Sequence, residues 1–251
     1  MQKIEAVILD MDGLMIDTER FAREAWRQAA SEVGYTIDEA LLTRTRGRTL
    51  EDGRTILLDA LGQGFPYAEV RSRRDAYVRE ALERGDIQAM EGLTVFLETI
   101  DSLQLKKAIA TSGQGDATSR KLAALGLNDS FGTVVCGDDI ENGKPAPDIF
   151  LEAARRLDAE PSQCVVLEDS DAGARAADAA GMRVIVIPEL RPPAPDVVSL
   201  AWRVLPSLIE AASLLADVCE KQAENGEATT ATSASPAHPV GPPEDLAPSQ
   251  R

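Results

Sequence analysis

Histidine and cysteine are scarce in this sequence, and their scarcity excludes several kinds of chemistry. The only histidine is His238, so histidine-containing triads, imidazole general bases and His-rich metal sites are excluded. The three cysteines are widely spaced. Two of them, Cys136 and Cys164, lie in valine-rich runs, where we expect packed thiols and no disulfide or zinc site. Any chemistry that this chain performs must therefore use carboxylates, hydroxyls and the six lysines.

Positive charge and long apolar runs are also lacking. The 251 residues include 26 basic and 42 acidic side chains, which gives a net charge of −16. Such a chain offers no broad basic surface, so we expect neither a nucleic-acid nor a membrane partner. No apolar run approaches the length of a membrane-spanning helix, and the strand-like run at residues 4–9 leaves no room for a signal peptide. We expect a soluble, cytoplasmic, monomeric protein.

Five short runs rich in β-branched residues predict the strands of a sheet. Each run is continuously apolar, which is typical of strands covered on both faces. The runs are Ala6–Asp10, Lys107–Thr111, Thr133–Cys136, Cys164–Leu167 and Arg183–Ile187. Helical stretches separate most of them, and this alternation predicts an α/β fold with a doubly wound, Rossmann-like parallel sheet.

The first two predicted strands are separated by a long segment, residues 18–91, with helical spacing of its apolar residues. We expect this segment to form an all-helical cap domain inserted into a core made of residues 1–17 and 92–216. Gly13 and Gly92, near its two ends, are candidate hinges. The last thirty residues contain five prolines and few large aliphatic side chains, so we expect a disordered tail over residues 217–251.

Polar side chains follow four of the predicted strands. The residues at these strand ends are Asp10-Met11-Asp12-Gly13, Thr111-Ser112, Gly143-Lys144-Pro145 and Glu168-Asp169-Ser170. Ligands of parallel sheets bind outside the carboxyl ends of the strands. These polar residues could simply be exposed to solvent, but that explanation would have to hold at all four strand ends at once. We therefore favour the interpretation that the four strand ends converge on one site.

Several carboxylates gathered at one site repel one another, and a hard divalent cation with oxygen ligands relieves that repulsion. Mg²⁺ fits, because it uses few carboxylates and completes its coordination with water or phosphate oxygens. Lys144 adds positive charge in a loop stiffened by Pro145 and Pro147. In an acidic protein, a single positively charged site of this kind favours the binding of a small anion, and phosphate is the obvious candidate.

The four motifs, in this order, resemble those of the haloacid dehalogenase superfamily, in its branch with a helical cap inserted after the first strand. The likeness extends over roughly residues 4–210. It implies Mg²⁺-dependent hydrolysis of a small phosphomonoester, a sugar or polyol phosphate, through an aspartyl-phosphate intermediate.

The resemblance also assigns roles to residues at the strand ends. Asp10 would be the nucleophile, and Asp12 would protonate the leaving oxygen and then activate the attacking water. Phosphate would be bound by Thr111, Ser112 and Lys144. The implied metal ligands are Asp10, Asp12 through its backbone carbonyl, Asp169, and Glu168 either directly or through water.

Two alternatives stay open. The sequence is also similar to β-phosphoglucomutase, a phosphomutase, but the mutase pattern has a histidine where this chain has Ala22 and an arginine near Leu50. A receiver-like phospho-signalling protein would also combine an acceptor aspartate, an acidic pair and a lysine. In a receiver, however, the acidic pair comes first, and there is no reason for the inserted segment. Hydrolysis therefore remains the favoured function.

The cap segment carries a basic run, Arg44-Thr45-Arg46-Gly47-Arg48. Arg46 and Arg48 are candidate substrate-binding residues that would contact a second anionic or hydroxyl-rich part of the substrate. Alternatively, the run is a solvated helix end whose arginines pair with Glu51 and Asp52. The sequence favours neither interpretation.

Overall fold

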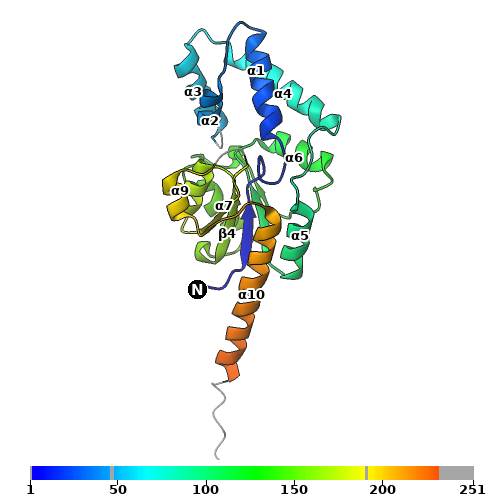
Figure 1. Cartoon of the computed structure of the whole chain (residues 1–251), viewed down its shortest axis with the longest axis vertical. Coiled ribbons are helices and arrows are strands. Elements are labelled where there is room, and N and C mark those ends of the chain that lie inside the picture. The colour runs from blue at the N-terminus through cyan, green and yellow to red at the C-terminus, as the bar shows by residue number, and fades with distance from the viewer. Residues whose placement is uncertain (1, 46–47, 190–191, 232–251) are drawn as a thin grey trace, which may run out of the picture.

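The computed structural model describes residues 2–45, 48–189 and 192–231, and its centre is a six-stranded sheet (Figure 1). All strand pairs are parallel, and the strand order is β3-β2-β1-β4-β5-β6. The strands are β1 (Ala6–Leu9), β2 (Lys106–Ala110), β3 (Val134–Val135), β4 (Cys164–Glu168), β5 (Arg183–Val186) and β6 (Arg203–Val204). The predicted doubly wound fold is confirmed. The sequence does not predict β6, because two exposed residues carry no periodic pattern.

Helices cover both faces of the sheet. Val7 and Leu9 of β1 pack in one hydrophobic cluster with α5, α6 and α10, whereas Ala6 and Ile8 pack in another with α7, α8 and α9. Because both faces are buried, β1, the strand at the centre of the sheet, is apolar at every position. The core helices are α5 (Leu93–Ser102), α6 (Gly115–Ala124), α7 (Asp148–Leu157), α8 (Asp171–Ala179), α9 (Pro195–Leu200) and α10 (Leu208–Ala231), with 3₁₀ helices at Gly137–Asp139 and Pro161–Gln163.

Four further helices form a separate layer beyond the carboxyl end of β1 (Figure 1). They are α1 (Glu19–Ser31), α2 (Glu39–Thr45), α3 (Leu50–Leu61) and α4 (Tyr67–Glu83). They enclose a hydrophobic cluster of their own, in which Ala29, Ile37, Leu57 and Val70 are buried. All four lie within the segment 18–91 that is expected to be the cap, and the domain boundaries stay a prediction.

The two connections between core and cap run beside each other. Ile16 of the first connection forms an isolated antiparallel bridge with Ala89 of the second, and the backbone amide of Met90 donates to the carbonyl of Met15 at 2.8 Å. Gly13 and Gly92 have φ angles of 91° and 85°. These left-handed conformations favour glycine, so both candidate hinges lie where the backbone needs that residue.

The structure differs from the predicted tail at residues 217–231. Helix α10 continues through Ala231, so the expectation of disorder is wrong for residues 217–231. Val218 and Cys219 pack against the core, and the side-chain amide of Gln222 bonds the backbone of Gln2 and Ile4. Most residues from 217 to 231 tolerate a helix, and the next proline after Pro206 stands only at position 236. Residues 232–251, including His238, lie outside the described residues.

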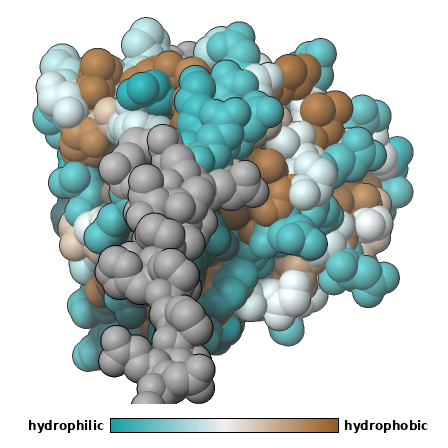
Figure 2. Space-filling view, turned by 90° about the horizontal axis from the view of Figure 1, so that it is seen from below, coloured by the Kyte–Doolittle hydropathy of each residue, from teal (hydrophilic) through white to brown (hydrophobic). Residues whose placement is uncertain are grey.

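The two cysteines expected to be packed thiols, Cys136 and Cys164, are buried and free. Among the described residues, no helix is both long and apolar enough to cross a bilayer. Figure 2 shows the end of the molecule farthest from the cap, where hydrophobic residues are scattered among hydrophilic ones. This end carries the amino ends of the strands, and the polar strand-end motifs lie at the opposite end.

Candidate active site

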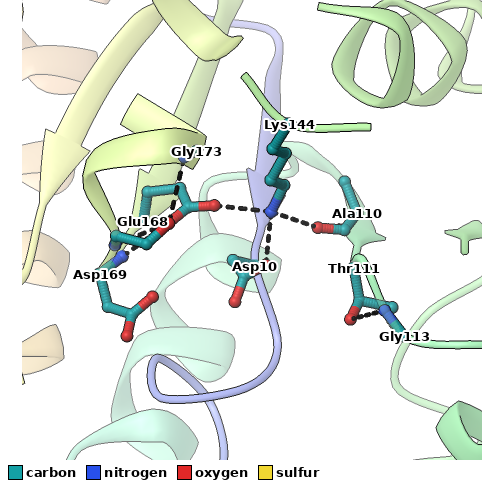
Figure 3. Close-up of polar contacts among 9 residues, drawn as sticks. Asp10, Ala110, Thr111, Gly113, Lys144, Glu168, Asp169 and Gly173 are labelled. Atoms are coloured by element: carbon teal, nitrogen blue, oxygen red, sulfur yellow. Dashed lines mark hydrogen bonds and ion pairs between the residues drawn. The ribbon is translucent and has the colours of Figure 1, made fainter. Parts of the chain in front are cut away.

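Three adjacent strands, β2, β1 and β4, bring the predicted residues together at their carboxyl ends (Figure 3). Asp10 follows β1, the strand between the other two, and its amide donates to the carbonyl of Leu167 at 3.0 Å. Thr111 follows β2, and Glu168 ends β4. The hydrogen bonds between the strands therefore fix the backbone positions of these residues, independently of any contact between their side chains.

Lys144 joins these strand ends from the loop before α7. Its Nζ donates to Asp10 Oδ1 at 2.5 Å, to Glu168 Oε1 at 2.6 Å and to the carbonyl of Ala110 at 3.2 Å. The three acceptors account for all three ammonium protons. Only 1% of the lysine side chain is exposed, so its charge is held in place and shielded from solvent.

Burial and charge act on Asp10 in opposite directions. Burial raises the pKa of Asp10 to about 7, against the lowering effect of Lys144 and with a further increase from Glu168. Burial disfavours the charged form of Lys144, yet the carboxylates of Asp10 and Glu168 outweigh it and raise the pKa of the lysine. Lys144 therefore remains a cation at neutral pH, ready to neutralise an anion.

Glu168 is fully buried and both of its oxygens accept hydrogen bonds. Its Oε2 accepts from the amides of Asp169 and Ser170 and from the Ser170 hydroxyl, at 2.9 to 3.0 Å, while Oε1 accepts from Lys144. Three donors converge on Oε2, whereas Oε1 accepts from Lys144 alone and keeps a lone pair. Glu168 therefore orders the loop and Lys144, and its Oε1 stays available for a metal contact, either direct or through water.

The carboxylate oxygens of Asp10, Glu168 and Asp169 lie within 4.8 Å of one another, and all three residues are buried. Hard oxygen donors at this spacing suit a divalent cation such as Mg²⁺. Gly13 makes room for the group, since a Cβ there would lie 2.3 Å from Asp169 Oδ2. The residues present therefore fit a metal centre.

Asp12 lies at the junction of core and cap. Its Oδ1 accepts from the Thr18 hydroxyl at 2.6 Å and from Lys121 Nζ at 2.5 Å. Burial works to raise the pKa of Asp12, but Lys121, the Thr18 hydrogen bond and the charge of Arg74 outweigh it, and the pKa is lowered. Sequence reasoning missed Lys121, because one lysine inside a helix carries no distinguishing pattern.

A cavity of about 400 Å³ opens above these residues, between core and cap. Thr111 and Ser112 line it from the core, and Thr111 is buried with its hydroxyl accepting from the amide of Gly113 at 3.1 Å. Asp10, Asp12 and Asp169 also line it. Trp26, Tyr67 and Arg74 line it from the cap; the sequence interpretation missed all three, because spacing gives no information on which cap side chains face the core.

The basic run of the cap is partly described. Arg48 lines the cavity, whereas Arg46 lies outside the described residues. Glu51, one expected partner of the run, pairs instead with Arg54 at 2.9 Å. In the described part of the chain, no ion pair of Arg48 is found. For this arginine, the position at the cavity supports the substrate-binding interpretation over that of a solvated helix end.

Comparison with known proteins agrees with this geometry. Residues 7–187 match the family described as haloacid dehalogenase-like hydrolase. The chain is 36% identical over 185 residues to a phosphorylated carbohydrates phosphatase of Thermotoga maritima, covering 72% of this chain and 84% of that protein. It is 33% identical over 187 residues to fructose-1-phosphate phosphatase of Escherichia coli, covering 73% and 96%.

A solved structure shares the overall fold. The crystal structure of β-phosphoglucomutase from Clostridium difficile matches with a TM-score of 0.70 and 26% identity, covering 82% of this chain and 92% of that one. The family match extends over most of the chain and includes all four strand-end motifs. The chain belongs to the haloacid dehalogenase-like hydrolases.

Proposed function

We propose that this protein is a Mg²⁺-dependent phosphatase that hydrolyses a small sugar or polyol phosphate through an aspartyl-phosphate on Asp10. One observation carries the proposal: Lys144 binds Asp10 and Glu168 beside a carboxylate cluster, at the floor of a cavity that the cap covers. A cation beside a nucleophilic carboxylate suits an incoming phosphoryl group, because positioning and electrostatics supply most of the rate in phosphoryl transfer.

In the first step, a carboxylate oxygen of Asp10 attacks phosphorus and the bond to the ester oxygen breaks. The protonated form of Asp12 donates its proton to that oxygen, so the product leaves as an alcohol. In the second step, water attacks the phosphorus, Asp12 accepts the proton of the water, and the bond to Asp10 breaks. Inorganic phosphate leaves, and both aspartates return to their starting states.

The other site residues bind or neutralise charge. Thr111, Ser112 and Lys144 would hold the phosphoryl oxygens. Asp10 and Asp169 would bind Mg²⁺ directly, with Glu168 bound either directly or through water and the backbone carbonyl of Asp12 as a further ligand. When bound, the cation neutralises charge on the phosphoryl oxygens and offsets the repulsion among the carboxylates.

The substrate class rests on the cavity and on the relatives. Trp26 and Tyr67 offer apolar faces, and Arg48 and Arg74 offer charged donors, in a space that suits a compact polar molecule. Two relatives are named for phosphorylated carbohydrates and for fructose 1-phosphate. These observations support a sugar phosphate as the substrate.

A phosphomutase is the second candidate, because the chain matches a β-phosphoglucomutase structure. Ala22 and Leu50 both line the cavity, at the positions where the mutase pattern has histidine and arginine. Neither side chain binds a proton or a phosphate, which favours the phosphatase. The match to a hydrolase family leaves the receiver-like alternative without support.

The experiment is incubation of the purified protein and Mg²⁺ with a panel of phosphate esters that includes fructose 1-phosphate and β-glucose 1-phosphate. Release of inorganic phosphate is the expected result. Accumulation of the 6-phosphate isomer without release would identify a mutase. Asp10→Asn is the matched control, which we expect to fold normally and to release no phosphate. The monomeric state and the cytoplasmic location stay predictions.

A further inference from the structure

Asp12 is held through one of its two carboxylate oxygens. Lys121 Nζ and the Thr18 hydroxyl both donate to Oδ1, at 2.5 and 2.6 Å. The two donors come from different parts of the fold: Lys121 lies on core helix α6, and Thr18 lies at the start of the cap. Two donors on one oxygen fix the plane of the carboxylate as well as its position.

The geometry leaves Oδ2 of Asp12 directed toward the loop that follows β2. A Cβ built on Gly113 would lie 3.9 Å from this oxygen, and no hydrogen bond to it is found among the described residues. Gly113 directly follows Thr111 and Ser112, the residues proposed to bind phosphate. The oxygen that Lys121 does not contact therefore lies beside the place where the phosphoester would bind.

The Lys121–Asp12 pair differs from an ordinary surface ion pair. The lysine side chain is 16% exposed and that of Asp12 31%, and both residues line the cavity. Exposed pairs between flexible side chains contribute little to stability. A pair at the wall of a cavity, with a second donor on the same oxygen, instead restricts the orientation of an acid–base group.

We infer that Lys121 is a positioning residue that holds Oδ1 of Asp12, so that Oδ2 is the atom that exchanges the proton with the ester oxygen and then with water. The inference rests on the proposed function and assigns separate roles to two lysines. Lys144 serves the nucleophile and the phosphoryl group. Lys121 serves the acid–base residue and contacts no reacting atom.

Leaving groups of different basicity test this role. A sugar alkoxide is a poor leaving group and needs a proton, whereas p-nitrophenolate leaves well without one. The value of kcat/KM reports the steps up to the first phosphoryl transfer. Because general acid catalysis contributes ~10² to 10⁴-fold, we expect Lys121→Met to lower kcat/KM for the best sugar phosphate by about tenfold or more. The loss with p-nitrophenyl phosphate should be several-fold smaller.

Three further variants give the test its controls. Lys121→Arg keeps the charge and a donor, so it should recover part of the loss. Lys107→Met removes another lysine that is 16% exposed, from an ion pair with Asp101 at the far end of the sheet, and it should affect both substrates equally or not at all. In an Asp12→Asn background, Lys121→Met should change kcat/KM by less than about twofold, because the first substitution already removes the acid–base function that Lys121 supports.

Equal losses on the two substrates, or a full tenfold loss in the Asp12→Asn background, would overturn the inference even if the enzyme is a phosphatase. Thermal unfolding of each variant identifies losses caused by a damaged fold. Wild-type protein that hydrolyses neither ester would instead overturn the proposed function, and this inference with it.

Discussion

Gly173 of helix α8 lies directly against the carboxylate of Glu168. A Cβ at position 173 would be 1.7 Å from Glu168 Oε1 and 2.0 Å from its Cδ, so even alanine does not fit. The first turn of α8, which Ser170 caps by accepting from the amide of Gly173 at 3.1 Å, can therefore approach the buried carboxylate only because position 173 has no side chain.

Gly173→Ala should displace Glu168 and, through it, Lys144. Overpacking of a filled interior costs about 1 to 3 kcal/mol, so we expect a loss of that size in the free energy of unfolding together with a large loss of activity. Urea unfolding and phosphate release measure the two effects. Gly53→Ala, in helix α3 with nothing within 4 Å of the new Cβ, is the control and should be neutral or slightly stabilising. A Gly173→Ala protein as stable and active as the wild type would contradict the packing argument.

Lys144→Met should be strongly destabilising as well as inactive. The substitution keeps most of the side-chain volume but leaves Asp10 and Glu168 buried beside each other without their cation. Removal of one partner of a buried pair typically costs about 3 to 5 kcal/mol. Denaturant titration measures the unfolding free energy of this variant. Lys107→Met, which removes an ion pair nearer the surface, is the control and should lose much less stability. An unchanged unfolding free energy would show that Lys144 does not compensate these carboxylates.

The loop that carries Lys144 also touches the cap. A Cβ on Gly143 would lie 1.8 Å from Cγ2 of Thr49, the residue that caps α3 by accepting from the amide of Asp52 at 3.2 Å. Gly143→Ala should therefore push the cap away from the core and lower kcat/KM severalfold. Thr49→Ser removes the methyl group and keeps the capping hydroxyl, so the double variant should regain most of the lost activity. A double variant no better than Gly143→Ala would show that the clash lies elsewhere.

Removal of the metal should abolish phosphate release, and added Mg²⁺ should restore it. Binding to the folded state alone also stabilises the protein, by ~2.7 kcal/mol at a concentration one hundred times Kd, so Mg²⁺ should raise the unfolding temperature. Asp169→Asn should remove that shift. Asp116→Asn alters another carboxylate of the same cavity outside the cluster and should keep it. An Asp169→Asn protein that Mg²⁺ stabilises as well as the wild type would exclude the proposed ligand set.

The strand-end residues of the site could be predicted from the sequence because the sheet itself places them. Parallel strands bring their carboxyl ends to one edge, so Asp10, Thr111 and Glu168 converge once the order of the strands is settled. Lys144 was found because glycine and prolines mark its loop.

Residues on helices and in the cap could not be found in this way. Which face Lys121 presents depends on how α6 packs against α4, and the direction of Trp26 and Arg74 depends on the tertiary arrangement of the cap. The length of α10 was missed for a similar reason, because contacts of Val218 and Gln222 with distant parts of the chain decide where that helix ends.

The paired connections between core and cap have a consequence for how such molecules diversify. The amide of Asp17 donates to the carbonyl of Gln88 at 3.0 Å, so the polypeptide departs from the sheet and comes back at almost the same point. We therefore expect that most of the segment between Asp17 and Gln88 can be exchanged for a differently shaped lid without any strand being displaced. A transplant that keeps Thr18, which donates to Asp12, should give a new substrate range while the side chains at the strand ends stay where they are.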